Sequence, residues 1–225
     1  MPISEVYNMD CMEYMKTIPD KYFDLCIADP PYGIGFGTFN RTNKTAQGET
    51  YKANKYHTGD WDKKAPGKEL FDELFRIAKN VIIWGGNYFD LPPTRGIIFW
   101  YKHQPVKNFS DGELAWSNFD RVARCFDYPY YGNINADKHR IHPTQKPIAL
   151  YNWILDNYAN GGGKIFDPFI GSGSSRIAAY MKGFDFYGCE LDPVYFKAQE
   201  DRFREECIGE LKTKDGKIWV QESLF

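Results

Sequence analysis

A four-residue segment, Asp29-Pro30-Pro31-Tyr32, follows directly after the apolar run 23–28. A carboxylate accepts hydrogen bonds from an amine, and the prolines, which have no N–H to donate, stiffen the turn and leave a carbonyl that accepts another. Tyrosine adds a flat face on which a nucleic-acid base can stack. Because ligands bind at the carboxyl ends of strands in open α/β sheets, these four residues are the candidate catalytic residues. The alternative is a turn that ends a strand and carries a core tyrosine.

A second segment, Asp167-Pro168-Phe169-Ile170-Gly171-Ser172-Gly173-Ser174, lies between a predicted strand and a predicted helix. Glycines let the backbone pass close to a ligand, and a helix N-terminus favours an anionic group. Glu190 ends the next apolar run, where an acidic residue commonly holds ribose hydroxyls. Position 176 is Arg, so the pyrophosphate fingerprint GxGxxG of an NAD-dependent oxidoreductase fails. The pattern therefore favours a nucleoside with a small charged tail, such as S-adenosylmethionine.

These two segments and a third, His142–Pro147, resemble the S-adenosylmethionine-dependent amino-methyltransferases of DNA. The order of the segments is that of the β-class, in which the catalytic tetrapeptide DPPY precedes the cofactor glycines. Two further stretches, Asn8–Cys11 and Trp84–Phe89, also resemble segments of this family. The resemblance implies an α/β fold, with a seven-stranded, mostly parallel, Rossmann-like sheet, helices on both faces and a circularly permuted motif order. In that arrangement Asp29 and Asp167 end adjacent strands.

The family's reaction, carried over to this chain, transfers a methyl group from S-adenosylmethionine to N6 of an adenine flipped out of double-stranded DNA. An exocyclic amine is a poor nucleophile because its lone pair is delocalised into the ring. Asp29 and the carbonyl of Pro30 would accept its two N–H groups and so localise the lone pair. In the family, Asp at the first position leans towards adenine and Ser towards cytosine, and N4 of cytosine stays an alternative acceptor. RNA methylation and a non-catalytic DNA-binding module are further alternatives.

The resemblance also implies which residues hold the cofactor. The glycine segment would line its methionine and ribose side, Glu190 the ribose hydroxyls, and residues 10–11 the adenine edge. Residues 144–146 would close over the methionine carboxylate. The predicted cofactor-binding residues are Asp10, Cys11, Asp29, Thr144, Gln145, Lys146, Asp167, Phe169, Gly171, Gly173, Ser174 and Glu190.

Alternating strands and helices must position these residues. Strands are predicted at 5–9, 23–28, 81–84, 97–101, 164–166 and 185–189, and helices at 68–79, from 147 onward, and at 174–181 and 193–207. This alternation predicts a mostly parallel α/β sheet. We expect one methyltransferase domain over 1–210, with a mobile substrate loop at 33–66, a small DNA-facing insert at 118–146 and a C-terminal tail at 211–225.

Charge is distributed unevenly along the chain. The net charge of the 225 residues is −2, yet residues 33–66 hold six basic and three acidic side chains, and residues 121–146 hold five and two. Basic segments of this kind suit the phosphates of DNA. The five cysteines form no CxxC pair, which predicts neither a disulfide framework nor a zinc site. With neither a secretory signal nor an apolar run of membrane-spanning length, we expect a cytoplasmic bacterial or phage protein that makes no membrane contact.

The last five residues, Gln221–Phe225, resemble the short peptides by which bacterial replication and repair proteins dock on the sliding clamp. Gln221 would make hydrogen bonds while Leu224 and Phe225 fill an apolar cleft. The alternative is a terminal strand at 218–220 whose last residues pack back on the domain. A homodimer that spans the duplex is a second expected assembly.

Overall fold

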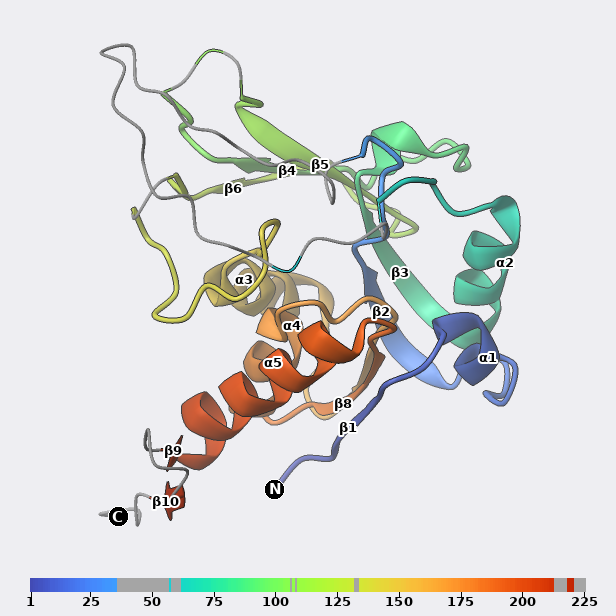
Figure 1. The fold of residues 1–225 in the computed structure, drawn as a ribbon. Coiled ribbons are helices and arrows are strands. Elements are labelled where there is room, and N and C mark those ends of the chain that lie inside the picture. Colours follow the sequence, from blue (N-terminus) through green and yellow to red (C-terminus); the bar gives the residue numbers. More distant parts are fainter. Residues whose placement is uncertain are drawn as a thin grey trace.

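The computed structural model describes residues 1–35, 57, 62–105, 107, 109–131, 134–212 and 218–220. They form an α/β layered structure around one sheet of eight strands (Figure 1). The elements are β1 (Ser4–Tyr7), α1 (Cys11–Met15), β2 (Phe23–Ala28), α2 (Lys68–Ile77), β3 (Ala78–Trp84), β4 (Ile98–Tyr101), β5 (Gly112–Ser117), β6 (Arg124–Asp127), α3 (Ile148–Tyr158), β7 (Lys164–Asp167), α4 (Ser174–Met181), β8 (Asp185–Cys189), α5 (Pro193–Phe203), β9 (Glu210–Lys212) and β10 (Ile218–Val220). The strand order of the large sheet is β1-β8-β7-β2-β3-β5-β4-β6.

Five neighbouring strands, β1, β8, β7, β2 and β3, run parallel. At the centre, Leu25 pairs with Ile165 and Cys26 with Phe166. This pairing confirms that the strands before the two predicted site segments are neighbours. Both strands are buried because helices cover both faces of a parallel sheet, which explains their nearly continuous apolar sequences.

Helices cover the two faces of the sheet (Figure 1). On one face, α1 and α2 pack over β2 and β3, and the apolar side of α2 buries Leu70, Leu74 and Ile77. On the other face lie α3 and α4, with Leu150 and Ile154 of α3 and Ala178 of α4 in a second core cluster. The fold class predicted from the sequence is therefore confirmed.

Several predicted elements differ from the structure, and the strands β5 and β6 were not predicted. The resemblance implied seven strands, whereas the sheet has eight, because β5 and β6 join β4 in an extension with antiparallel pairs. The strand β6 lies inside the predicted insert at 118–146 and pairs with β4, so the insert begins within the sheet. Only Phe126 of β6 is buried, which explains why no apolar run marked it. The predicted helix 68–79 ends at Ile77, because Ala78 is extended and begins β3.

The C-terminal part carries a small sheet of its own. β9 and β10 pair antiparallel, so a strand does form at 218–220. The proposed clamp-binding residues Gln221, Leu224 and Phe225 lie outside the described residues, as does most of the predicted loop 33–66. The clamp and the homodimer stay predictions. Within the described ranges, no helix is long and apolar enough to cross a membrane.

A buried arginine on α5 ties two site segments together. The Arg202 side chain is 1% exposed and donates to the Ser172 carbonyl at 3.0 Å in the glycine loop. It also pairs with Asp137 at 3.1 Å and with Glu206 at 2.7 Å. Asp137 in turn accepts a hydrogen bond from Gln145 at 3.2 Å. The glycine loop and the segment before α3 are thus held against the same helix.

We expect Arg202→Met to lower the free energy of unfolding by about 3–5 kcal/mol, because it leaves two carboxylates and a carbonyl without their buried partner. Urea unfolding followed by circular dichroism measures the loss. The matched control is Lys197→Met on the same helix, whose exposed pair with Asp201 is worth at most about 1 kcal/mol. Equal losses in the two variants would contradict a structural role for Arg202.

Candidate active site

An open cavity of about 1910 Å³ lies where the parallel strands end. Most of the predicted site residues line it: Asp10, Cys11, Asp29, Pro30, Pro31, Tyr32, Thr144, Gln145, Lys146, Phe169, Gly171 and Glu190. The predicted residues Asp167, Gly173 and Ser174 are buried and lie outside this lining. The cavity therefore joins the tetrapeptide to the first part of the glycine loop.

The tyrosine of the tetrapeptide is held in place by its neighbours. Its hydroxyl donates to Asp29 Oδ1 at 2.9 Å, and burial together with the Asp29 carboxylate raises the pKa of Tyr32, so this donor stays protonated. The ring stacks on Tyr88 with 4.8 Å between centroids and 14° between planes. Gly85 has a positive φ of 68°, and a Cβ there would lie 2.3 Å from the Tyr32 ring. Only glycine fits at this position.

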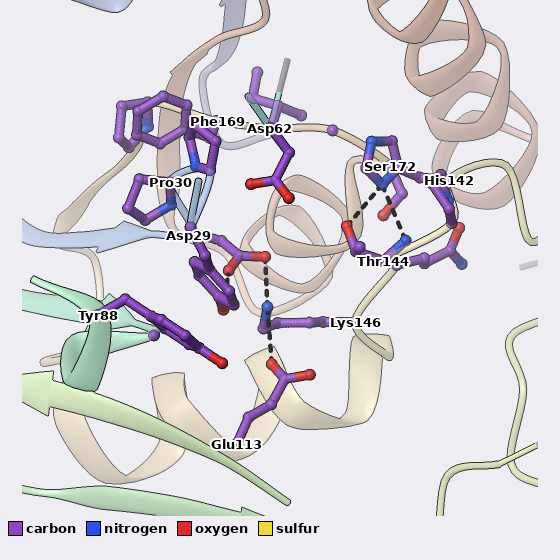
Figure 2. A pocket seen from close by; sticks show the side chains of 18 of the residues that line it. Asp29, Pro30, Asp62, Tyr88, Glu113, His142, Thr144, Lys146, Phe169 and Ser172 are labelled. Atoms are coloured by element: carbon purple, nitrogen blue, oxygen red, sulfur yellow. Dashed lines mark hydrogen bonds and ion pairs between the residues drawn. The ribbon is translucent and has the colours of Figure 1, made fainter. Parts of the chain in front are cut away.

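Lys146 lies beside the Asp29 carboxylate (Figure 2). Its ammonium is 2.5 Å from Asp29 Oδ2 and 3.2 Å from Glu113 Oε2. The sequence predicted that Lys146 closes over the cofactor, and the structure pairs it with these two carboxylates. Glu113, which also accepts a hydrogen bond from Lys102, was not predicted as a site residue. The signal for it was a charged residue inside the largely apolar strand β5.

Two acidic residues shape the glycine loop. Asp167 Oδ1 accepts the Phe169 N–H at 2.9 Å, and Oδ2 accepts the Ser175 hydroxyl at 2.5 Å. Burial raises the pKa of Asp167 to about 7. Glu190 accepts the N–H groups of Gly171 and Asp192, each at 2.9 Å, and burial also raises its pKa. Since a carboxylate has about four acceptor positions, Glu190 keeps capacity for ribose hydroxyls.

The N-terminal segment reaches the same end of the cavity. Asp10 caps α1 by accepting the Met12 N–H at 2.8 Å, and Cys11 is buried beside it. The Asn8 amide donates to the Glu190 carbonyl at 2.7 Å. The residues predicted at the adenine edge are therefore held next to the residue predicted at the ribose.

The segment before α3 is ordered by its own side chains (Figure 2). The Nδ1 atom of His142 lies 3.0 Å from the Thr144 hydroxyl, and burial with the Lys146 charge lowers the pKa of His142 to about 3, which keeps the ring neutral. Gln145 accepts from the backbone of Ile141 at 3.0 Å. Gln145 thus has a structural role, while Thr144 is exposed at the cavity.

One histidine outside the predicted site residues also has a partner at this cavity. His57 Nε2 lies 3.2 Å from Asp192 Oδ2, and its carbonyl accepts the Tyr195 hydroxyl at 2.6 Å. Tyr195 and Asp192 both line the cavity. This contact attaches one residue of the predicted substrate loop to the start of α5.

The fold and the site define a class of protein: an α/β domain in which a nucleoside-type glycine loop and a DPPY turn share one cavity. Residues 99–201 match the family described as DNA methylase, of the N6/N4 type. The type II methyltransferase M2.MboI of Moraxella bovis is 24% identical over 245 residues, which cover 89% of this chain and 87% of the relative.

Two solved structures share the fold. The crystal structure of the M1.HpyAVI–SAM complex has a TM-score of 0.54 at 20% identity, covering 88% of this chain and 98% of that one. The PvuII DNA methyltransferase, described as cytosine-N4-specific, has a TM-score of 0.55 at 14% identity, covering 90% and 87%. Residues 99–201 thus match the N6/N4 DNA methylase family, and the whole chain shares its fold with these two solved methyltransferases.

The raised pKa of Asp167 predicts a pH-dependent stability. The folded protein holds this proton more tightly than the unfolded chain, whose Asp titrates near pH 3.9. The stabilisation is therefore complete below about pH 4 and is lost as the pH rises to about 7. Relative to Asp167→Asn, which does not titrate, the wild type should lose a few kcal/mol over this range, at about 1.4 kcal/mol per pKa unit.

Urea unfolding at pH 4, 5.5, 7 and 8 measures this difference. Asp120→Asn is the matched control, because the Asp120 side chain is 87% exposed and its removal should leave the pH profile unchanged. A constant difference between the wild type and Asp167→Asn at all four pH values would show that Asp167 is not protonated in the folded protein.

Proposed function

We propose that this protein transfers a methyl group from S-adenosylmethionine to the exocyclic N6 of an adenine flipped out of double-stranded DNA. One observation carries the proposal: the DPPY turn after β2 and the glycine loop after β7 line the same cavity. A methyl donor held by the loop and an amine held by the turn would meet there. Holding two reactants together can supply up to about 7–11 kcal/mol of the barrier.

The cavity fits S-adenosylmethionine by its charge and its backbone. Acidic side chains outnumber basic ones in the lining, seven to four, which suits a cofactor that carries a positive sulfur. Gly171, with a φ of 52°, brings the loop backbone to the cavity. Glu190 would hold the ribose, Phe169 and Gly171 would lie along the cofactor, and Asp10 and Cys11 would contact the adenine. When bound, S-adenosylmethionine supplies an electrophilic methyl group.

Two acceptors of the DPPY turn would prepare the amine. The Asp29 carboxylate and the Pro30 carbonyl accept its two N–H groups, which draws the nitrogen towards tetrahedral geometry and concentrates its lone pair. The same acceptors stabilise positive charge that develops on nitrogen during transfer. No covalent intermediate with the protein is required, so neither a serine nor a cysteine nucleophile is needed.

The target base must leave the duplex before it reaches Asp29. Extrusion costs a few kcal/mol, and stacking on an aromatic ring returns about 1–3 kcal/mol. Tyr32 is the ring for this contact, and Tyr88 and Gly85 hold it in place. The basic residues Lys64 and Arg140, which also line the cavity, would lie near the phosphates.

Cytosine N4 is the second candidate acceptor. It presents a similar amine, and the PvuII enzyme of the same fold is described as cytosine-N4-specific. Asp at the first position of the tetrapeptide supports adenine. Expression in a bacterium without DNA methylation, followed by digestion and mass spectrometry, separates N6-methyladenine from N4-methylcytosine. Matched duplex DNA and RNA substrates test RNA methylation, and the absence of any methylated product with intact DNA binding would favour a non-catalytic module.

We expect Asp29→Ala to abolish methyl transfer while cofactor affinity stays within about tenfold. Loss of one transition-state acceptor costs about 2.7–4 kcal/mol, by analogy with oxyanion-hole deletions. Single-molecule sequencing of DNA from the expressing strain identifies the methylated sites, and turnover is then measured on a duplex that contains them. Asp120→Asn is the matched control on an exposed carboxylate. Near-normal turnover of Asp29→Ala would contradict the role of Asp29.

Glu190→Ala should act on the cofactor instead. Losing a hydrogen bond to a charged group costs about 1.5–3 kcal/mol, which corresponds to a loss of affinity of about 10- to 100-fold. Calorimetric titration with S-adenosylmethionine measures it, with Glu13→Ala as the control, because Glu13 is 62% exposed on α1. Unchanged affinity in Glu190→Ala would show that Glu190 does not hold the ribose.

A further inference from the structure

A partly buried group of alternating charges includes the Asp29 carboxylate. Asp29 contacts Lys146, and Lys146 contacts Glu113 (Figure 2). Glu113 in turn contacts Lys102. All four residues line the cavity. They come from four separate parts of the fold: the end of β2, the segment before α3, strand β5 and the segment after β4. Four separate parts of the chain are thus linked to the Asp29 carboxylate through Lys146, which indicates that the group acts on Asp29.

Lys146 is charged although it is buried. Its side chain is 4% exposed, and burial alone would lower the pKa of its ammonium. The carboxylates of Asp29 and Glu113 more than offset burial and raise that pKa. Burial alone would likewise raise the pKa of Glu113, yet Lys146 and Lys102 lower it to about 2. The ammonium also lies 5.4 Å from the centre of the Trp84 ring, a further favourable contact for a cation.

These contacts fix the orientation of the Asp29 carboxylate. Lys146 holds Oδ2 at 2.5 Å, and the Tyr32 hydroxyl holds Oδ1 at 2.9 Å. With both oxygens held, the carboxyl group cannot rotate without breaking one of the two bonds. About four acceptor positions exist on a carboxylate, so two remain for the amine of a base. The direction in which the Asp29 oxygens can accept a hydrogen bond from the amine is therefore fixed before the base binds.

We propose that Lys146 is a positioning residue for methyl transfer, which acts by orienting the Asp29 carboxylate, and that Glu113 with Lys102 holds Lys146 in place. This inference rests on the proposed function and deepens it. It assigns Lys146 to the amine end of the cavity, and not to the methionine carboxylate of the cofactor as the sequence suggested.

The test compares Lys146→Gln, Lys146→Arg and Lys146→Ala with the wild-type protein on a duplex that carries the mapped site. Lys146→Gln should lower kcat at least about 100-fold, the scale on which a misplacement of about 1 Å acts. The KM for DNA and the calorimetric affinity for S-adenosylmethionine should stay within threefold. Lys146→Arg, which keeps the charge, should recover part of kcat. Ethylammonium added to Lys146→Ala should restore turnover in proportion to its concentration.

Two further variants keep the test independent of folding. Glu113→Gln leaves the contact between Lys146 and Asp29 in place, so it should lower kcat less than Lys146→Gln does. The variant that combines Glu113→Gln with Lys146→Gln should have a kcat no lower than that of Lys146→Gln alone. Lys182→Gln is the control and should match the wild type, because it breaks only a remote pair between the end of α4 and Asp156 of α3.

The outcomes separate the two proposals. A wild-type protein that methylates no nucleic acid overturns the proposed function and this inference together. An active wild type with kcat of Lys146→Gln within threefold overturns the inference alone. A loss confined to cofactor affinity also overturns it and returns Lys146 to the methionine carboxylate. If Lys146→Gln fails to fold, Glu113→Gln decides the test. A change in KM and cofactor affinity with an unchanged kcat in Glu113→Gln then overturns the inference.

Discussion

The parallel pairing of β2 with β7 is the interaction on which the rest of the site depends. The register Leu25–Ile165 and Cys26–Phe166 brings Asp29 and Asp167 to adjoining strand ends, although they are far apart in the sequence. Hydrogen bonds along both strands set this register, and a shift by one residue would turn every buried side chain of the shifted strand to the opposite face, away from its packing partners. Under the proposed function, this register is what brings the methyl donor and the acceptor amine together.

Acidic groups gather at this edge, and the structure balances each one differently. Asp167 is buried and protonated at low pH, with its oxygens accepting the Phe169 N–H and the Ser175 hydroxyl. Glu190 accepts two backbone N–H groups. Asp29 is paired with Lys146. Under the proposed function, the glycine-loop end of the cavity would keep negative potential for a positive sulfur, while the Asp29 carboxylate is paired with the Lys146 ammonium.

The extension of the sheet by β5, β4 and β6 contributes residues to the lining of the cavity. Strand β5 carries Glu113, and the segment after β4 carries Lys102. Both belong to the part of the chain that matches the DNA methylase family, which begins at residue 99. The extension therefore does more than complete the sheet, because it holds Lys146 against Asp29. Arg202 adds a second brace by joining the glycine loop to Asp137, close to the same segment before α3.

The sequence by itself determined the fold class and the two motifs, and most of the site residues that it predicted line the cavity. These features are local: an apolar strand followed by a polar turn predicts its own position at a sheet edge. It missed β5 and also β6, which buries only Phe126, and it did not predict the pairing of Lys146 with Asp29. Only the tertiary structure decided which charged side chains form ion pairs. Lys146 and Asp29 lie far apart in the sequence, and no helical or strand periodicity predicts that they meet. Their pairing follows from strand order, and strand order is set by the packing of the whole sheet.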